Sequence, residues 1–193
     1  MSTYPATFEL DAPHEMARWR PFVQWILAIP HLIIANVISS LSQVIAFVSW
    51  FVIVFTGKLP EGLANLQAMC IRYQIRAYSY AGFLRTSYPA FEFDMTQAEP
   101  GGDEVSVELP AQLEDRNRLT VGLRLFMLIP IAIVGILWSI VAMFVGFIGA
   151  FAILFTGAWP AGLRETMVKV NRWFVQVDAY GLLLRDEFPP LGL

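Results

Sequence analysis

The chain contains one sequence unit written twice, with a constant offset between the two copies. The segment FTGKLPEGL at 55–63 matches FTGAWPAGL at 155–163 without a gap, and the same offset aligns Arg72 with Arg172. Shared apolar composition alone does not keep the glycines and prolines of a nine-residue block in register, so the pattern indicates an internal duplication. Any fold of this chain must therefore be built from two similar halves.

Each copy has the same order of parts. A short alternating stretch, ATFEL or VSVEL, is typical of a β-strand, and a basic step, a long apolar run, the FTGxxPxGL corner and a helix of mixed polarity follow it. In the corner, the glycine suits a left-handed helix end and the proline suits the first turn of the next helix. The boundaries that follow are repeat 1 at 1–95, an acidic linker at 96–104, repeat 2 at 105–193, apolar runs at 21–56 and 122–156, and mixed helices at 60–87 and 160–187.

Composition places the apolar runs in a membrane. Apolar residues make up 56% of the chain and charged residues 15%, with a mean hydropathy of +0.56. Soluble domains carry about 25% charged residues. The net charge is only −3, which gives no case for a nucleic-acid partner. The sequence predicts an all-α membrane protein with short β-strands outside the membrane.

The number of membrane crossings per apolar run is open between one and two. As a single helix, a run of about 35 residues would be about 50 Å long, against about 30 Å of hydrocarbon. Basic residues flank both ends of the first run, Arg18 and Arg20 before it and Lys58 after it. A transmembrane hairpin puts both ends on the cytoplasmic face, as the positive-inside rule favours, whereas a single span does not. We favour the hairpin, with its tip near residue 40 or 140 and both termini in the cytoplasm.

A stripe of small residues runs through each apolar run with a spacing of 4, 3, 4 and 3. Such a stripe lets helices approach closely in lipid, where packing drives association. It fits one face of an unbroken helix as well as two short arms meeting face to face. The helix-packing candidates are Ala35, Ser39, Ser42, Ala46 and Ser49 in the first copy, and Gly135, Ser139, Ala142, Gly146 and Gly149 in the second.

The helices after the two corners combine arginine and lysine with aromatic residues, which suits helices lying at the level of lipid headgroups. The candidates for contact with anionic headgroups or with an acidic partner are Arg72, Arg76, Lys169 and Arg172. Because both copies keep Arg72 and Arg172 while other charges differ, a structural role within the fold is the alternative for these two.

The segment from 91 to 115 holds half of the 16 acidic residues. This excess of acidic residues could mark a surface that binds cations or a basic partner, but a solvated linker is the simpler interpretation. The stretch FEFD at 91–94 alternates like the two strands beside it, so a small three-stranded sheet outside the membrane is expected.

No catalytic set is recognisable in the sequence. His31 is the one ionisable group in the first apolar run, which makes it a candidate, but its counterpart is Ile131. Pro30 and Pro130 could break a helix and expose carbonyl groups, although a packing kink is the simpler role. With a single cysteine, Cys70, and no metal-ligand spacing or phosphate loop, the sequence predicts no enzyme, no cofactor and no metal.

The pattern AIPHLI at 28–33, FTGKLPEGL at 55–63, Arg72 and the YP pair at 88–89 resembles DUF4389, a family of uncharacterised bacterial integral membrane proteins. The resemblance covers both halves, and the second half lacks the histidine after Pro130. It implies a membrane protein of bacteria and no particular activity.

Two functions remain, from different classes. The first is a non-enzymatic accessory or scaffold subunit of the bacterial inner membrane, which packs against itself or against a larger membrane complex. The alternative is a small transporter or channel for a lipid or ion, built from the duplicated, proline-containing unit. Few polar groups line the apolar runs, which weighs against an ion pathway but not against a lipid groove.

Overall fold

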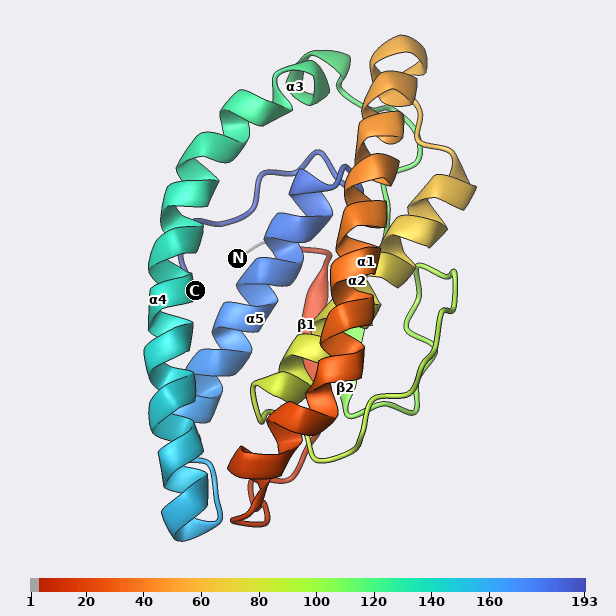
Figure 1. Cartoon of the computed structure of the whole chain (residues 1–193). Coiled ribbons are helices and arrows are strands. Elements are labelled where there is room, and N and C mark those ends of the chain that lie inside the picture. Colours follow the sequence, from red (N-terminus) through yellow and green to blue (C-terminus); the bar gives the residue numbers. More distant parts are fainter. Residues whose placement is uncertain (1–3) are drawn as a thin grey trace.

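Two long helices and two shorter ones form most of the chain in the computed structural model, which describes residues 4–193. The first three residues, which include the N-terminus that the sequence places in the cytoplasm, lie outside the described part. The elements are β1 (Thr7–Leu10), α1 (Arg20–Thr56), α2 (Glu61–Ala81), β2 (Val105–Glu108), α3 (Arg118–Gly122), α4 (Arg124–Thr156) and α5 (Ala161–Gly181) (Figure 1).

Each apolar run is one unbroken helix, so the predicted hairpin is wrong. The chain stays helical through Ser40 and Ser139, where the hairpin needed a turn. Both hydroxyl groups donate to carbonyl oxygens four residues earlier in the helix, and no glycine-proline pair interrupts it at either point. Pro30 and Pro130 also lie inside the helices without ending them. Both helices are long and apolar enough to span a membrane.

The corner motif turns the chain sharply after each long helix. Gly57 and Gly157 take the left-handed conformation, with φ of 73° and 78°, and their N–H groups donate to the carbonyl groups of Ile53 and Ile153. A side chain is strained in this conformation, which explains why both copies have glycine there. The next helix begins directly after the corner proline and packs back along the first.

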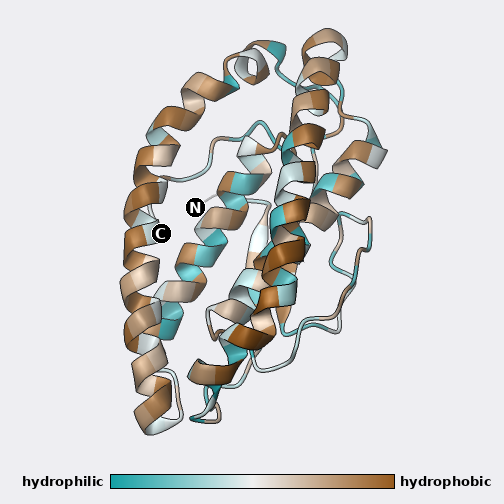
Figure 2. Ribbon diagram, viewed as in Figure 1, coloured by the Kyte–Doolittle hydropathy of each residue, from teal (hydrophilic) through white to brown (hydrophobic). Residues whose placement is uncertain are grey.

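The four large helices form two layers. Helix α2 packs on α1 and α5 packs on α4, with α1 in front of α2 and α4 to the left of α5 in Figure 1. We call α1 and α4 the outer layer, and α2 and α5 the inner layer. Brown, apolar residues dominate α1 and α4 in Figure 2, whereas α2 and α5 alternate between apolar and polar. The second helices end at 81 and 181, six residues earlier than predicted, because Phe83 and Leu183 take positive φ angles just after the helix ends.

A two-stranded antiparallel sheet covers the inner helices. Phe8 pairs with Val107 in its register, and residues 91–94 form no strand, so the predicted third strand is wrong. Strand β1 of repeat 1 packs on α5 of repeat 2, while β2 of repeat 2 packs on α2 of repeat 1. Each copy therefore gives its strand to the other copy, and the two form one hydrophobic core around the sheet.

Matching hydrogen bonds relate the copies by an approximate two-fold axis. The N–H of Met16 donates to the Gly157 carbonyl at 2.7 Å, and the N–H of Arg116 donates to the Gly57 carbonyl at 3.1 Å. Each bond joins the segment before one long helix to the corner of the other copy. Such reciprocal contacts are the signature of a two-fold interface.

Candidate functional site

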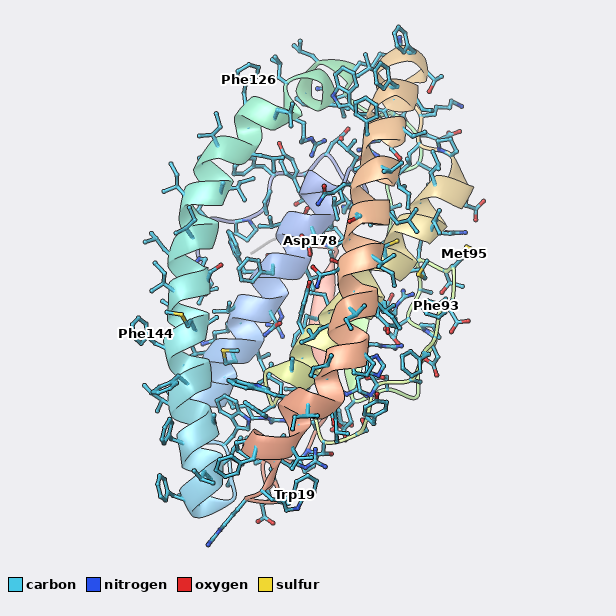
Figure 3. The ribbon with its side chains drawn as sticks, viewed as in Figure 1. Trp19, Phe93, Met95, Phe126, Phe144 and Asp178 are labelled. Atoms are coloured by element: carbon cyan, nitrogen blue, oxygen red, sulfur yellow. The ribbon has the colours of Figure 1, made fainter. Side chains whose placement is uncertain are left out.

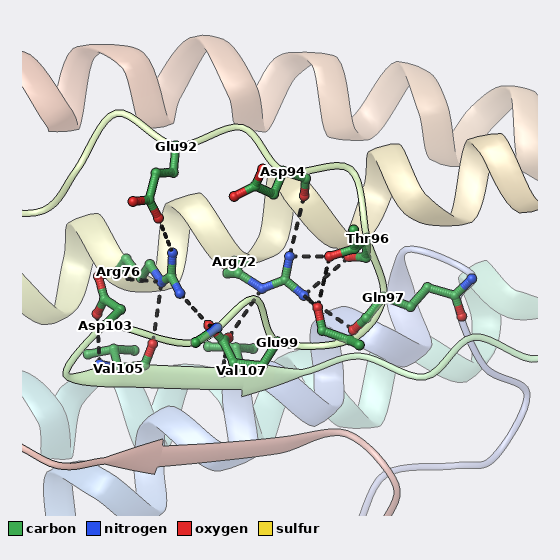
Figure 4. Close-up of polar contacts among 12 residues, drawn as sticks. Arg72, Arg76, Glu92, Asp94, Thr96, Gln97, Glu99, Asp103, Val105 and Val107 are labelled. Carbon is green, nitrogen blue, oxygen red and sulfur yellow. Dashed lines mark hydrogen bonds and ion pairs between the residues drawn. The ribbon is translucent and has the colours of Figure 1, made fainter.

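Arg72, near the middle of α2, is enclosed by the linker (Figure 4). Its guanidinium donates to the carbonyl oxygens of Thr96, Gln97 and Ala98 at 3.1–3.2 Å, and its Nε lies 3.3 Å from Glu99 Oε2. The residue is 3% exposed. The linker therefore folds around one buried arginine and satisfies most of its donors with backbone oxygens.

Arg76, one turn further along α2, extends the same cluster. It forms ion pairs with Glu99 and, at 3.2 Å, with Glu92, and its Nε donates to the Val105 carbonyl at 3.3 Å. Glu99 is thus shared between Arg72 and Arg76, and it also accepts the N–H of Val107 from β2 at 2.8 Å. The cluster joins α2, the linker and the sheet into one unit.

This geometry corrects two expectations. Arg72 and Arg76 do not lie on a lipid-facing surface, because their donors are used by the linker inside the fold. Helix α2 is an inner helix with most of its residues buried, and not an interfacial one. The linker is more than a solvated spacer, because Glu99 and Asp103 are paired with arginines, although Thr96, Ala98 and residues 100–102 are exposed. Its acids and carbonyl groups compensate two charges that would be costly to bury alone.

The corresponding side chains of repeat 2 are arranged differently. Arg172 is exposed and donates to the Phe8 carbonyl of β1 at 3.2 Å. Lys169 is also exposed and pairs with Glu165 one turn earlier at 2.8 Å. Both cations are open to solvent on the inner layer, and their contact with anionic lipid or an acidic partner stays a prediction.

A second buried ion-pair cluster lies at the start of α4, and the sequence analysis missed it. Arg116 and Arg124 both bind Asp186, at 2.7 and 2.6 Å. Burial raises the pKa of Asp186, but hydrogen bonds from Arg116 and from the N–H of Asn117 outweigh it, so the net pKa lies below the ordinary value. The repeat offers a signal for Arg124, because its counterpart Gln24 makes equivalent bonds to the carbonyl groups of Tyr80 and Arg85.

The small-residue stripe of repeat 1 faces α2. Ala35, Ser42 and Ser49 are buried, and Ser39 and Ala46 lie half-buried beside them. The Ser42 hydroxyl accepts a hydrogen bond from the Gln67 amide of α2. The stripe thus brings α1 close to the second helix of its own repeat.

The stripe of repeat 2 has two parts. Gly135 lies against the ring of Trp173 of α5, and Gly149 lies against the ring of Trp159 in the corner before α5, where a Cβ atom at Gly149 would collide with that ring. Ala142 and Gly146 instead line an open groove, and Ser139 is exposed.

The groove lies between the first turns of α1 and the second half of α4. Its volume is about 590 Å³, and its lining is almost wholly apolar. Binding sites for small molecules have volumes of about 300–1,000 Å³ and mostly apolar linings. The principal lining side chains are Phe22, Trp25, Phe83, Met143 and Phe151.

His31 is fully buried among aromatic rings. Its Nδ1 lies 2.9 Å from the Tyr73 hydroxyl, and its ring stacks on Phe91 with centroids 4.3 Å apart. The aromatic environment accounts for its position by packing. Within residues 4–193, no group of three histidine, cysteine or acidic side chains could hold a metal ion.

Asp178 is a further residue that the sequence analysis overlooked. It is a partly buried acid on α5 that lies between α4 and α1 in Figure 3. Burial raises its pKa to about 7. Tyr78, its counterpart in α2, faces it across the two-fold axis, and burial followed by the Asp178 charge raises the pKa of that phenol.

The family model described as "Domain of unknown function (DUF4389)" matches the chain twice, over residues 18–92 and 118–191. The chain belongs to the DUF4389 family. The two matches are the two repeats from the basic step onward, so this DUF4389 protein carries the domain in tandem. The search of curated proteins and the search of solved structures returned no match.

Proposed function

We propose that this DUF4389 protein is a non-enzymatic accessory or scaffold subunit that is embedded in the bacterial inner membrane and packs against itself or a larger membrane complex. The observation that carries the proposal is the unpartnered outer surface of α1 and α4. Phe55 is 73% exposed, Phe126 72% and Leu125 75%. Figure 3 shows Phe126 and Phe144 pointing outwards, away from α5.

The size of this surface supports the proposal. Exposed apolar patches on soluble monomers rarely exceed a few hundred Å², and larger ones mark protein or membrane contacts. Large apolar side chains are exposed along both long helices, from Phe22 to Phe55 and from Leu125 to Phe155. The polar groups that could serve chemistry are used by internal ion pairs, which supports a binding role over a catalytic one.

The apolar layer and the exposed cations also indicate which partners the protein binds. The bilayer covers the apolar layer, and the exposed Lys169 and Arg172 are available to anionic headgroups or to acids of another protein. Under this proposal we also expect both termini of the chain to lie in the cytoplasm.

Gentle purification from the native membrane, followed by identification of every co-purifying molecule, tests the proposal. We expect one membrane protein at fixed stoichiometry, or a discrete oligomer of the chain. As a matched pair, Val44→Lys on the outer face of α1 should abolish that assembly, whereas Glu165→Lys on α5 should not. A monomer that carries no protein in any mild detergent would refute the scaffold function.

The groove between α1 and α4 favours a second candidate, a lipid carrier. An acyl chain needs an apolar channel without charges, which matches the lining of the groove. The proline-interrupted helices of the earlier hypothesis are not part of this candidate, since α1 and α4 run through their prolines.

Lipid analysis of the purified protein separates the two candidates. Gly146 lines the groove and has open space where a Cβ atom would lie, so Gly146→Leu fills the groove without a clash. Gly162, in the first turn of α5, has equally open space outside the groove and serves as the control. A carrier loses stoichiometric lipid in Gly146→Leu and keeps it in Gly162→Leu, whereas a scaffold keeps its protein partner in both.

A further inference from the structure

We propose that α1 and α4 lie broadside in a single leaflet of the membrane, with their axes in the membrane plane, and do not cross it. The ligand of the outer surface is then a lipid monolayer. This proposal goes beyond the scaffold function, although both require that the apolar layer lies in lipid. It rests on the length of the helices, the position of exposed charges and the charges at the helix ends.

Helix length is the first argument. Helix α1 has 37 residues and α4 has 33, so at 1.5 Å per residue they are about 55 and 50 Å long. To cross about 30 Å of hydrocarbon with both ends at its borders, helices of this length must tilt by more than about 50°, whereas spanning helices tilt by about 0–40°. A helix in the membrane plane has no such length limit.

Exposed charges beside the middle of α4 are the second argument. The chain around α5 contacts α4 at two points, through Trp159 at Gly149 just before the helix and through Trp173 of α5 at Gly135. Lys169 lies between those two residues in the sequence, so it is level with the central part of α4, and its side chain is 49% exposed. A bilayer crossed along the α4 axis would place this ammonium group near its midplane, where an exposed charge is strongly unfavourable.

The same conflict arises beside α1. The segment 91–97, which leads into the linker, runs along α2, with Phe91 stacked on His31 of α1 and Gln97 bonded to Asn65 of α2. Glu92, whose side chain is 47% exposed, and Asp94, also exposed, lie along this path. Exposed carboxylates therefore accompany the central turns of α1, and a slab of hydrocarbon centred on the helix and perpendicular to its axis would include them.

In the broadside orientation these groups leave the membrane. The exposed charges of α5 and the linker belong to the layer behind α1 and α4, whereas the outer faces of the long helices carry no Asp, Glu, Lys or Arg between residues 21 and 56 or between 125 and 156 (Figure 2). One orientation thus buries the apolar face and hydrates every exposed charge named above.

The ends of α1 give the third argument. Arg18 and Arg20 precede the helix, and Lys58 follows it. In the broadside orientation all three lie at the headgroup level of the same leaflet, where Arg18 and Arg20 can meet anionic phosphates, while Lys58 pairs with Glu114 at 2.9 Å. The charge pattern that favoured a hairpin is therefore satisfied without a turn in the helix.

Depth measurements along α1 test the proposal. Nitroxide labels go on single cysteines at Phe22, Ile33, Val44 and Phe55, in a Cys70→Ala background. These four positions are spaced by 11 residues on one face, and all are at least 60% exposed. The protein is reconstituted in vesicles of phosphatidylethanolamine and phosphatidylglycerol, and immersion depth is read from the relative accessibility to oxygen and to a polar nickel complex. Labels at Phe126, Leu137 and Ile148 repeat the test on α4, and a label at Lys169 reports on the inner layer.

Broadside helices give similar depths at all four α1 positions, about 5–10 Å below the phosphates, and a water-accessible label at Lys169. A spanning helix gives labels at Ile33 and Val44 that are far deeper than those at Phe22 and Phe55, and this result overturns the proposal. Labels that are water-accessible at every α1 position also overturn it.

Two-sided labelling is an independent check that does not require reconstitution. Cysteines at Arg18 and Lys58, at opposite ends of α1, should react with a membrane-impermeant maleimide from the same face of oriented membrane vesicles. Reaction from opposite faces overturns the proposal, and it leaves the scaffold function intact because co-purification of a partner is measured separately.

Discussion

The α1–α2 pair and the α4–α5 pair share one fold but are joined by different chemistry. In repeat 1, Ser42 bonds Gln67 and His31 contacts Tyr73 across the helix pair. At the same positions, repeat 2 has Ala142 with Met167 and Ile131 with Trp173. Repeat 1 buries far more of its long helix than repeat 2 does. The comparison teaches that backbone geometry was kept while polar contacts, and the groove beside α4, differ between the copies.

The largest expected difference between the copies concerns one repeated arginine. Arg72→Met removes a buried partner of Glu99 and should lower the free energy of unfolding by about 3–5 kcal/mol. Arg172→Met removes an exposed side chain and should cost less than about 1 kcal/mol. Chemical unfolding in one detergent, followed by circular dichroism, measures both. Equal losses would contradict the different roles assigned to the two arginines.

Asp178 should make the stability of the fold depend on pH, whereas its counterpart Tyr78 should not. The folded-state pKa of Asp178 is about 7, above the ordinary 3.8, so the folded state binds its proton more tightly than the unfolded state. Wild-type stability therefore falls as pH rises from about 4 to about 7, by at most about 4 kcal/mol.

Asp178→Asn should remove that slope, matching wild-type at pH 4 and exceeding it at pH 8. Tyr78→Phe is the control and should keep the slope. Thermal unfolding between pH 4 and pH 8 measures it. A slope that persists in Asp178→Asn would assign the pH dependence to another group.

Gly149 tests whether the two copies need different residues where the long helix contacts the corner that follows it. The corresponding position in repeat 1 is Ser49, and the counterpart of Trp159 there is Leu59. Gly149→Ser forces a side chain into the Trp159 ring and should destabilise by about 1–3 kcal/mol. In a double-mutant cycle with Trp159→Leu the two changes should couple favourably, because leucine vacates the space. Strict additivity would show that the ring and the glycine do not depend on each other.

The smallest effect is expected at the polar contact of repeat 1. Ser42→Ala leaves the Gln67 amide without its partner and should cost about 1–2 kcal/mol. The double change Ser42→Ala with Gln67→Met copies repeat 2 and should recover most of that loss. Urea unfolding of the three proteins tests this. A double variant less stable than Ser42→Ala would mean that the apolar pair of repeat 2 does not transfer.

The duplication, the long apolar helices and the corner could be read from sequence because each depends on local chemistry. Gly57 reaches its left-handed conformation through contacts within its own turn. The hairpin prediction failed because it was inferred from charges at the ends of the run, and that pattern fits a helix in the membrane plane equally well. The prediction of a third strand failed because the alternating pattern at 91–94 also fits an irregular segment. Its two aromatic residues stack on α1 and α2 instead of pairing with a strand.

The ion-pair clusters could not be predicted from local pattern. The amphipathic helix around Arg72 predicted an interfacial residue, yet the partners of Arg72 lie 22 to 27 residues further along the chain, in the linker and just before it. Asp186 is 62 residues from Arg124. Such contacts depend on how the layers stack, which one sequence does not specify. Only the retention of Arg72 in both copies pointed to a role inside the fold.

The exchange of strands between the copies bears on how such a protein could arise. Strand β1 serves α5, strand β2 serves α2, and the bonds from Met16 to Gly157 and from Arg116 to Gly57 cross between the halves in both directions. A chain with a single copy would lack a strand over its inner helix, and a second identical chain would supply it through the same reciprocal bonds. The tandem protein thus has the geometry of a symmetric homodimer fused head to tail, with the linker as the covalent joint. Once the copies are fused, each half can change its own contacts independently. One molecule can therefore have polar contacts between α1 and α2 and an apolar groove beside α4.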